Sequence, residues 1–283
     1  MKNQASCLCG GVQWEITAEP FNAFNCHCKM CRKAHGSAFC TCWFVKPEEL
    51  NWLSDTDTIV HYGSSHLLTR SFCGTCGSVV PYLSEHGEDH WAVPGGCHDD
   101  GKKSDCHVFA AHSAPWYDIT DDLPRHDDYP DYTGMERVEE EALEPGPEGI
   151  VRGSCLCGTV IYEISEPFTL VQNCHCHRCR KARAAAHATN GFTSMDGVKF
   201  TQGEDNLAFY KVPDAKYFTQ VFCKTCGSKM PRLDPGRGIA VVPFGGLDDD
   251  PGVKPERHIY VEDMAKWYQI TDDLPVFDQE PTS

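Results

Sequence analysis

The sequence lacks any long hydrophobic run. None of the apolar stretches in its 283 residues approaches the roughly 20 residues that a membrane-spanning helix needs. The first cysteine motif begins at Cys7, which leaves no room before it for a secretory signal peptide. We therefore expect a cytoplasmic protein without a membrane anchor, in which thiols stay reduced.

Positive charge is also scarce. Lysine and arginine number 25 against 41 aspartate and glutamate residues, which gives a formal net charge of -16. Sequence-independent binding of nucleic acid depends on clustered lysine and arginine. We therefore expect no nucleic-acid partner and look instead for a small-molecule substrate. The sequence does not indicate an oligomeric state.

The sequence also has few long segments in which apolar residues recur at helical spacing. Apolar residues instead alternate with polar ones, as in half-buried strands. This alternation includes Val12, Trp14 and Ile16, and again Val160, Tyr162 and Ile164. Residues 216–222 are interpreted as a further strand, and 202–206 as a turn. The expected class is all-β, with small sheets held together by metal.

The chain repeats itself once. Four segments return in the same order: 6–16 as 154–164, 25–34 as 173–182, 72–83 as 222–233, and 116–124 as 267–275. The offset between equivalent residues grows from 148 at Cys7 and Cys155 to 151 at Trp116 and Trp267. Two copies of one domain with small insertions explain this drift, and two are too few for a solenoid.

Domain boundaries follow from the repeat. We predict one domain over residues 1–134, an acidic linker over 135–150, and a second domain over 151–283. The linker contains Pro145, Gly146 and Pro147. It could be a short helix followed by a break, or a solvated tether.

Cysteine is abundant, with eighteen residues, of which fourteen fall in the repeated frame. In a reducing compartment such cysteines indicate metal ligands rather than disulfides. In each copy a C-x-x-C knuckle followed by glycine supplies two sulfurs, and an early C-x-C pair on an extended segment supplies two more. The pattern predicts two closed structural zinc sites, Cys7, Cys9, Cys73 and Cys76 in the first copy and Cys155, Cys157, Cys223 and Cys226 in the second.

The remaining cysteines form a C-x-C-x-x-C cluster in each copy, Cys26, Cys28 and Cys31 and then Cys174, Cys176 and Cys179. Three protein ligands and one open position are typical of catalytic zinc. His35, Cys40, Cys42 or a distant carboxylate could instead close the first site. We favour an open site because Ala188 and Asn190 stand where Cys40 and Cys42 would recur.

These motifs resemble a known family. The order C-x-C-G, N-C-H-C-x-x-C-R-K, G-S-A-F, F-C-x-x-C-G and W-Y-x-I-T-D-D-L-P is similar to the glutathione-dependent formaldehyde-activating enzymes, a family that includes centromere protein V. The resemblance covers nearly all of both copies. It implies the Mss4-like fold, a structural four-cysteine zinc and a second zinc on three cysteines in each copy, and thus up to four zinc ions per chain.

The resemblance also implies a function. The family's activity is carbon–sulfur lyase chemistry, in which glutathione and formaldehyde condense to S-(hydroxymethyl)glutathione or are released from it. Two alternatives stay open: lyase or isomerase chemistry on another small molecule, and a zinc-stapled interaction module without catalysis. Fold and metal transfer better than substrate within such a family.

The two copies differ after the cluster. The first keeps G-S-A-F at residues 36–39, whereas the second has A-A-A-H at 184–187. We therefore favour the first copy as the active one, with Cys26, Cys28 and Cys31 holding the reactive metal and Ser37 beside it. In the second copy His187 could fill that space or supply a fourth ligand.

Arg32 and Lys33 are the positive charges nearest to the first cluster, so they are candidates for binding the carboxylates of a glutathione-like substrate. The alternative for both is a solvated helix start. His27 and His175 lie inside the C-x-C pairs, and alternation is expected to point them away from the metal.

Overall fold

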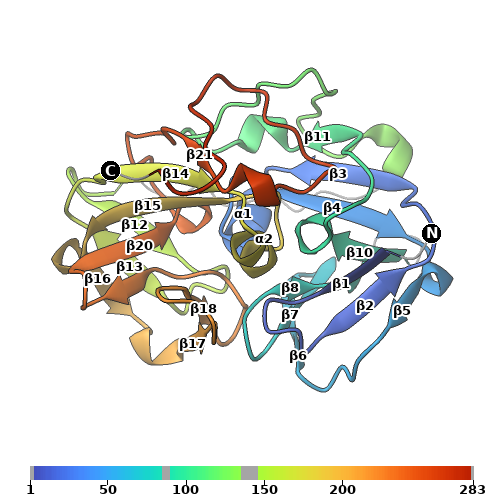
Figure 1. Ribbon diagram of the computed structural model, residues 1–283, viewed down its shortest axis with the longest axis horizontal. Coiled ribbons are helices and arrows are strands. Elements are labelled where there is room, and N and C mark those ends of the chain that lie inside the picture. Colours follow the sequence, from blue (N-terminus) through green and yellow to red (C-terminus); the bar gives the residue numbers. More distant parts are fainter. Residues whose placement is uncertain (1–2, 85–89, 135–145, 282–283) are drawn as a thin grey trace.

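The computed structural model describes residues 3–84, 90–134 and 146–281. Within them the first repeat forms the right half of Figure 1 and the second repeat the left half. The strands of the first repeat are β1 (Asn3–Ser6), β2 (Gln13–Ile16), β3 (Asn22–Cys26), β4 (Cys40–Val45), β5 (Leu50–Trp52), β6 (Ile59–Ser65), β7 (Leu68–Cys73), β8 (Val79–Val80), β9 (Tyr82–Ser84), β10 (His90–Pro94) and β11 (Cys106–Val108). Those of the second are β12 (Val151–Ser154), β13 (Ile161–Ile164), β14 (Leu170–Cys174), β15 (Ala188–Ser194), β16 (Val198–Gln202), β17 (Leu207–Lys211), β18 (Thr219–Cys223), β19 (Arg232–Asp234), β20 (Ile239–Pro243) and β21 (His258–Ile259).

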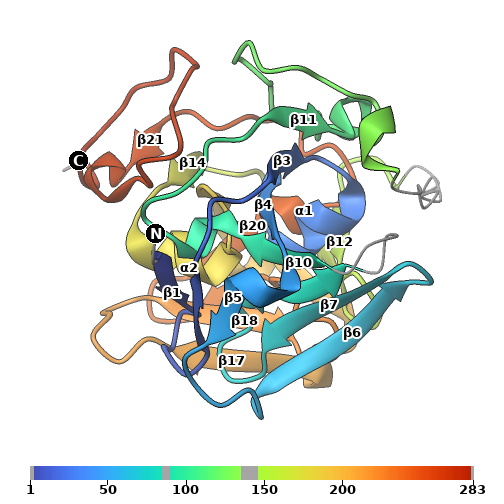
Figure 2. The same cartoon turned by 90° about the vertical axis from the view of Figure 1, so that its right-hand side faces the viewer.

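Each repeat builds the same sheets. The first has a five-stranded sheet in the order β11-β3-β4-β10-β9, and the second has the order β21-β14-β15-β20-β19. Strands β1-β2-β5 and β12-β13-β16 form a smaller sheet in each repeat, and β6-β7-β8 corresponds to β17-β18. The outer strands β11 and β21 carry the loops at the top of Figure 2. The expected all-β class with two tandem copies is confirmed.

Burial follows part of the alternation expected from the sequence. Val12, Trp14 and Ile16 are buried and Gln13 is exposed, but Glu15 is buried as well. In β13 Tyr162 and Ile164 are buried, and the residues between and before them are half-buried. The strand expected over residues 216–222 is shorter, because β18 begins only at Thr219. Residues 213–217 form turns and bends, so the apolar Tyr217 and Phe218 belong to the connection.

Two seven-residue helices occur in the described residues, α1 (Lys29–His35) and α2 (His177–Arg183). Both begin at a cysteine whose sulfur accepts a hydrogen bond from a backbone N–H in the first turn, Cys31 N–H to Cys28 in α1. Both end at a residue in the left-handed conformation. In α1 that residue is Gly36, which adopts this conformation at little cost, and in α2 it is Ala184.

The two repeats pack against each other around an approximate two-fold axis. The rings of the equivalent residues Phe72 and Phe222 meet at a centroid distance of 6.3 Å. Likewise the hydroxyls of Thr120 and Thr271 lie 2.5 Å apart. Contact between equivalent residues is the signature of the self-complementary interface of a symmetric dimer. The two repeats therefore form a pseudo-dimer, and its main core cluster contains residues of both repeats.

The helices cross this interface at the centre of Figure 1. Helix α1 packs on the 3₁₀ turn η7 (Phe244–Gly246) of the second repeat, and α2 packs on η2 (Gly95–Cys97) of the first. Glycine makes this approach possible. A Cβ at Gly245 would come within 2.3 Å of the Ser37 nitrogen, and one at the equivalent Gly96 within 2.0 Å of the Ala185 nitrogen.

Lys229 is buried close to the axis of the pseudo-dimer. Its Nζ donates to the carbonyl oxygens of Gly77 at 2.6 Å and Gly227 at 2.9 Å, which are equivalent positions of the two repeats. The carbonyl of Ala34 in α1 accepts a third bond at 3.0 Å. Burial lowers the pKa of Lys229 to about 7. Val79 is the equivalent residue of the first repeat, so this lysine occurs on one side only.

Most of the predicted linker, residues 135–145, lies outside the described residues, and 146–150 contain a turn. In the part of the chain that is described, no helix has the length and apolar character needed to cross a bilayer. The boundaries 1–134 and 151–283 stay predictions.

Candidate metal centres and their surroundings

Four sulfurs converge in each repeat at the predicted structural site. The sulfur atoms of Cys7, Cys9, Cys73 and Cys76 all lie within 4.8 Å of one another. Cys7 Sγ is 3.4 Å from Cys9 Sγ, which is 3.7 Å from Cys73 Sγ. In the second repeat Cys155, Cys157, Cys223 and Cys226 gather in the same way.

The early C-x-C pair reaches this site from a turn, not from an extended segment as expected. Gly10 N–H donates to the Cys7 carbonyl at 3.1 Å, and Cys7 N–H to the Val12 carbonyl at 3.0 Å, which closes a loop around the sulfurs. A tight turn presents both sulfurs while exposing backbone N–H groups to them. One such bond runs from Val12 N–H to Cys7 Sγ at 3.3 Å. Gly77 adopts φ +74° after the C-x-x-C knuckle, as expected.

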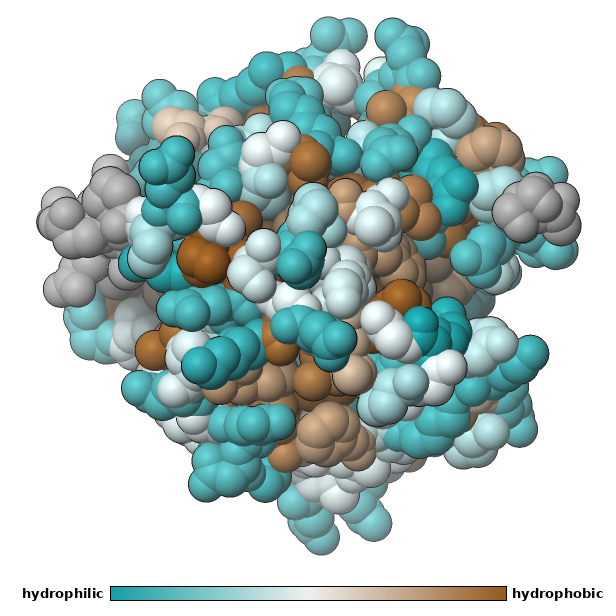
Figure 3. Space-filling view, turned by 90° about the vertical axis from the view of Figure 1, so that its left-hand side faces the viewer, coloured by the Kyte–Doolittle hydropathy of each residue, from teal (hydrophilic) through white to brown (hydrophobic). Residues whose placement is uncertain are grey.

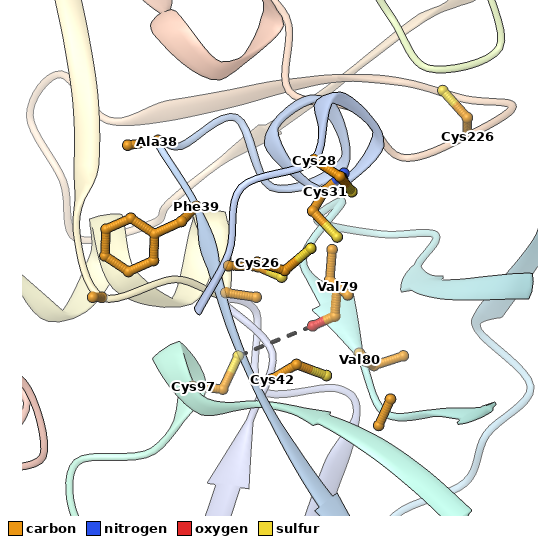
Figure 4. Packing of buried hydrophobic residues seen from close by; sticks show 14 of the residues in the cluster. Cys26, Cys28, Cys31, Ala38, Phe39, Cys42, Val79, Val80, Cys97 and Cys226 are labelled. Atoms are coloured by element: carbon orange, nitrogen blue, oxygen red, sulfur yellow. Dashed lines mark hydrogen bonds between the residues drawn. The ribbon is translucent and has the colours of Figure 1, made fainter. Parts of the chain in front are cut away.

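Three sulfurs converge at the second type of site. Cys26 ends β3, Cys28 precedes α1 and Cys31 lies in its first turn, and their sulfurs are within 4.8 Å of one another. In Figure 4 the sulfurs of Cys26 and Cys31 point toward each other beneath the helix. Hydrogen bonds from Cys26 and Cys28, then Cys40, and the charge of Arg70 hold the pKa of the Cys31 thiol well below its usual range.

The candidates for a fourth ligand are placed as follows. The thiol of Cys40 interacts with those of Cys26 and Cys31 but stays outside the group of mutually close sulfurs. Cys42 is buried next to Tyr82. The ring of His35 turns to the second repeat, where its Nδ1 lies 2.9 Å from the Arg183 carbonyl oxygen. Of these, Cys40 alone adjoins the cluster.

A cavity of about 620 Å³ opens onto the cluster of the second repeat. Cys174, Cys176 and Cys179 line it, and Cys176 is the more exposed of the three. Hydrogen bonds from Cys174 and Cys179 lower the pKa of Cys176 to about 3. The cavity makes the second cluster accessible to a small molecule. The preference for the first repeat, drawn from Gly36 and Ser37, stays a prediction.

A buried arginine stands beside each three-cysteine cluster. In the first repeat Arg70 from β7 donates through Nη2 to Cys31 Sγ at 3.4 Å. In the second repeat Gln220 occupies that strand position, and the guanidinium comes instead from Arg183 at the end of α2. Arg183 donates to Asn190 Oδ1 at 3.0 Å and to Gln220 Oε1 at 3.3 Å.

The two residues predicted to bind the substrate, Lys33 and Arg32, make contacts within the protein, and their binding role stays a prediction. Lys33 is buried at the interface, 2.7 Å from Asp248 Oδ1 of the second repeat, and also donates to Ser154. Arg32 donates to the His27 carbonyl at 3.2 Å. In the sequence alone Lys33 looks like a solvated residue of a short helix. It is buried because the second repeat packs against this helix.

Ser37 and His187 likewise belong to the interface. The Ser37 hydroxyl donates to the His187 carbonyl at 2.7 Å. The His187 ring packs edge-on against the Phe39 ring, with 5.6 Å between the ring centroids. His187 does not belong to the group of ligand atoms formed by the three sulfurs of the second cluster. Neither of its ring nitrogens has a hydrogen-bond partner in the described residues. The structure thus brings neither residue into a cluster.

A chain of hydrogen bonds runs outward from each cluster. His27 Nε2 lies 2.8 Å from His107 Nδ1, and His107 Nε2 lies 2.9 Å from Asp121 Oδ1. His175, His258 and Asp272 repeat the arrangement. His27 is fully buried, and burial lowers its pKa to about 3. Because a neutral histidine with a fixed partner holds one orientation, these chains position the backbone between the cysteines.

Several of these residues were not identified from the sequence. No functional role was assigned from the sequence to Arg70, Arg183, Asp121 or Asp272. The recurrence of His107 with Asp121, and of His258 with Asp272, at the same spacing of 14 residues was the available signal for the chains. The arginines beside the clusters could not be found by comparing the repeats, because Arg70 lies in a strand and Arg183 in a helix, at positions that are not equivalent.

The donor sets fit zinc. Cysteine thiolates are its preferred ligands in structural sites, and four mutually close sulfurs suit a closed tetrahedral site. Three sulfurs leave one ligand to be supplied from outside the group. Backbone N–H groups aimed at sulfur, as from Cys31 to Cys28, stabilise the thiolate form that a metal requires.

Comparison with known proteins identifies the family. Residues 2–112 and 150–263 match the glutathione-dependent formaldehyde-activating enzyme family, so the chain belongs to it and carries two copies of its Mss4-like domain. A protein of Schizosaccharomyces pombe, named an uncharacterized lyase, is 28% identical over 125 residues, 38% of this chain and 85% of that protein. A Rhodobacter sphaeroides crystal structure is 22% identical, covering 34% of this chain and 86% of that chain, with a TM-score of 0.28.

Proposed function

We propose that this chain is a zinc-dependent lyase that makes or breaks the carbon–sulfur bond between a glutathione-like thiol and formaldehyde or another small carbonyl compound. The family match and the lyase name of the yeast relative support lyase chemistry. The observation that carries the proposal is the cavity on a group of three sulfurs, Cys174, Cys176 and Cys179. An interaction module needs no such opening beside its metal.

Zinc on three thiolates would leave a coordination position for a substrate thiol and would lower the pKa of that thiol. The substrate sulfur then attacks the carbonyl carbon, a carbon–sulfur bond forms, and the π electrons move to oxygen. That oxygen takes a proton from solvent. In the reverse direction the hydroxyl loses its proton, the carbon–sulfur bond breaks and the thiolate leaves.

Residues of the second repeat can stabilise the oxygen that gains charge. Arg183 holds the side-chain oxygens of Asn190 and Gln220, so the amide nitrogens are the groups that these two cavity-lining residues can use as donors. Gln220 Nε2 has no partner among the described residues. Donors fixed before the reaction stabilise a developing alkoxide more than mobile water does.

Two other properties stay predictions. Up to four zinc ions per chain, in two closed and two three-cysteine sites, follow from the sulfur groups and the family. A cytoplasmic location follows from the reduced state expected of the cysteines, and none of the eighteen forms a disulfide.

The test is a turnover assay with the zinc-loaded full chain, glutathione and formaldehyde, with the spontaneous rate subtracted. We expect a rate above the spontaneous one that is lost in Cys176→Ser at matched zinc content in the other sites. Cys106→Ser is the control, because this buried cysteine belongs to none of the four sulfur groups. A wild-type rate equal to the spontaneous rate would refute the lyase assignment and favour the interaction module.

A further inference from the structure

The cavity of the second repeat is rich in positive charge, although the whole chain is strongly acidic. Its lining includes five cationic side chains, Arg178, Arg183, Lys216, Arg232 and Arg237, against the carboxylates of Asp263 and Glu280. A low-dielectric wall strengthens the attraction of such a lining for anions. The cavity therefore differs in charge from the surface around it.

Some of the positively charged side chains that line the cavity are available to a ligand. Arg178 is exposed on α2 and has no ion-pair partner within the described residues. Arg232 and Arg237 share the single carboxylate of Asp234, at 2.9 and 2.8 Å, so two guanidinium groups face one negative charge. Arg237 also lies over the Tyr217 ring, 4.3 Å from its centroid, which fixes its position at the cavity.

Figure 3 shows the face of the molecule on the side of the second repeat. Hydrophilic side chains cover much of that face, and apolar ones gather toward its middle (Figure 3). A cavity of about 620 Å³ lies in the range that holds small molecules and cofactors. Its size and charge suit an anionic compound of several hundred daltons.

Two of the arginine positions carry no charge in the first repeat, although Arg70 stands at the position of the cavity residue Gln220. By the repeat offset Met30 stands for Arg178 and Tyr82 for Arg232, and Phe24 replaces the cavity residue Gln172. Tyr82 and Phe24 are buried, and Met30 packs partly buried against the core. The charges of Arg178 and Arg232 are thus properties of the second repeat, not of the shared fold.

Aromatic residues surround the first cluster instead. The rings of Phe109 and Tyr129 meet at 4.8 Å, nearly at right angles. Tyr129 is half-buried and packs against the core cluster that contains Cys26, Cys28 and Cys31. In the second repeat the corresponding residues are Tyr260 and Glu280, both of which line the cavity.

We propose that the two three-cysteine sites have diverged in ligand class, and that only the site of the second repeat recognises an anionic, carboxylate-bearing ligand, through Arg178 and Arg232. The proposal rests on the proposed function for the reaction at that site, and it adds that the two repeats are not interchangeable. Among the described residues of the first repeat, Met30 and Tyr82 stand in place of these two arginines, and the buried Arg70 is held by the sulfur of Cys31.

The experiment measures equilibrium binding of S-methylglutathione to the zinc-loaded full chain by calorimetry. This probe keeps both carboxylates but has no free thiol, so its binding reports charge recognition without turnover. We expect one site per chain. We also expect the probe with its two free carboxylates to bind at least about tenfold more tightly than its dimethyl ester. The ester cannot form the charge-assisted hydrogen bonds that the carboxylates accept from arginine.

The matched variant gives the second repeat the residues of the first, Arg178→Met with Arg232→Tyr. We expect it to weaken S-methylglutathione binding about tenfold or more. Arg178→Met alone, on an exposed helix face, serves if the double variant folds poorly, and Arg178→Lys should retain most of the affinity. Lys199→Met is the control, since it removes a positive charge from an exposed position of β16 outside the cavity.

A stoichiometry of two, equal binding of the ester, an unchanged affinity in the double variant or no saturable binding would each overturn the proposal. The proposed reaction can fail separately. Charge-selective binding at one site together with turnover no faster than the spontaneous rate would refute the lyase assignment and leave this inference standing.

Discussion

Phe72 and Phe222 occupy equivalent positions in the two repeats, and their rings pack against each other across the axis of the pseudo-dimer. Both rings are almost completely buried. Each also fills the space over a glycine of the opposite knuckle, because a Cβ at Gly77 would come within 2.5 Å of the Phe222 ring and one at Gly227 equally near the Phe72 ring. The interface therefore joins the regions that carry both four-cysteine sites.

Truncation of either ring should destabilise the whole chain. We expect Phe72→Ala and Phe222→Ala each to lower the free energy of unfolding by about 3 kcal/mol, since each leaves a cavity in a packed core. The double variant should cost less than the sum of the two by about 1 kcal/mol. Denaturant unfolding measures this. Phe209→Ala, at a ring that is 66% exposed, is the control and should change stability little. Additive losses would show that the rings do not interact.

The two kinds of sulfur site should differ in their effect on stability. Cys223→Ser breaks a closed site that links the end of β18 to the turn after β12, so we expect a large loss of thermal stability. Cys28→Ser alters a three-cysteine site next to a single helix and should cost less. Thermal unfolding with zinc analysis of each variant is the measurement. Equal losses would contradict the division into structural and reactive sites, and purified protein without zinc would refute the metal assignment altogether.

Turnover should depend on the second repeat. We expect Cys176→Ser to abolish the lyase reaction with glutathione and Cys28→Ser to leave most of it, because the cavity opens onto Cys176. The G-S-A-F segment had favoured the opposite result. Initial rates of both variants at matched zinc content decide between them. Loss in Cys28→Ser alone would restore the first repeat as the active one.

Acid should destabilise the protein through buried neutral histidines. Burial, and less strongly the neighbouring His258, lowers the pKa of His187 to about 3, below the ordinary value of 6.5. Between these values the unfolded chain binds a proton that the folded chain does not. Stability is therefore fully present above pH 6.5 and falls by up to about 1.4 kcal/mol per pH unit for this group as the pH drops toward 3.

The matching variant is His187→Phe, which copies Phe39 of the first repeat. It should raise stability at pH 4.5 relative to the wild type by more than it does at pH 7.5, in paired urea denaturation curves. Loss of zinc at acid pH affects both proteins alike and cancels in the difference. An identical difference at the two pH values would show that His187 does not titrate on unfolding.

An arginine at the end of α1 should be able to replace Arg70 of β7 beside the first cluster, as Arg183 does at the end of α2 in the second repeat. Arg70→Gln removes a buried charge that hydrogen-bonds to Cys31, and we expect a loss of about 2 kcal/mol and weaker zinc retention at that cluster. Adding His35→Arg and Cys42→Asn copies the set Arg183, Gln220 and Asn190 of the second repeat. We expect the triple variant to recover part of both losses. No recovery would mean that the two arrangements are not equivalent.

The sulfur groups could be predicted from the sequence because their ligands lie in short motifs with fixed spacing that occur twice. The strand pattern was equally local, as the burial of Trp14 next to the exposed Gln13 shows. The turn at Cys7 was mistaken for an extended segment, because two cysteines can share a face in either geometry. Each cysteine motif occurs twice in the same order, which favours metal binding over chance spacing.

The interface could not be predicted in this way. Lys33 and Ser37 are polar residues in or just after a short helix, and nothing in the sequence distinguishes them from solvated side chains. Their partners, Asp248 and the His187 carbonyl, lie more than 100 residues away. The cavity was missed for the same reason, since Arg178 and Arg232 lie 54 residues apart in the sequence and line one cavity only in the folded chain.

Lys229 sets a limit on how this molecule could be assembled. Its ammonium group lies between the carbonyls of Gly77 and Gly227, which an axis of symmetry would interchange. Two identical subunits would have to place two lysines against the same pair of carbonyls, and buried like charges at that distance repel strongly. Here the other position is Val79. The second repeat on its own is therefore a poor homodimer, and the fused chain has become an obligate pairing of two unlike halves.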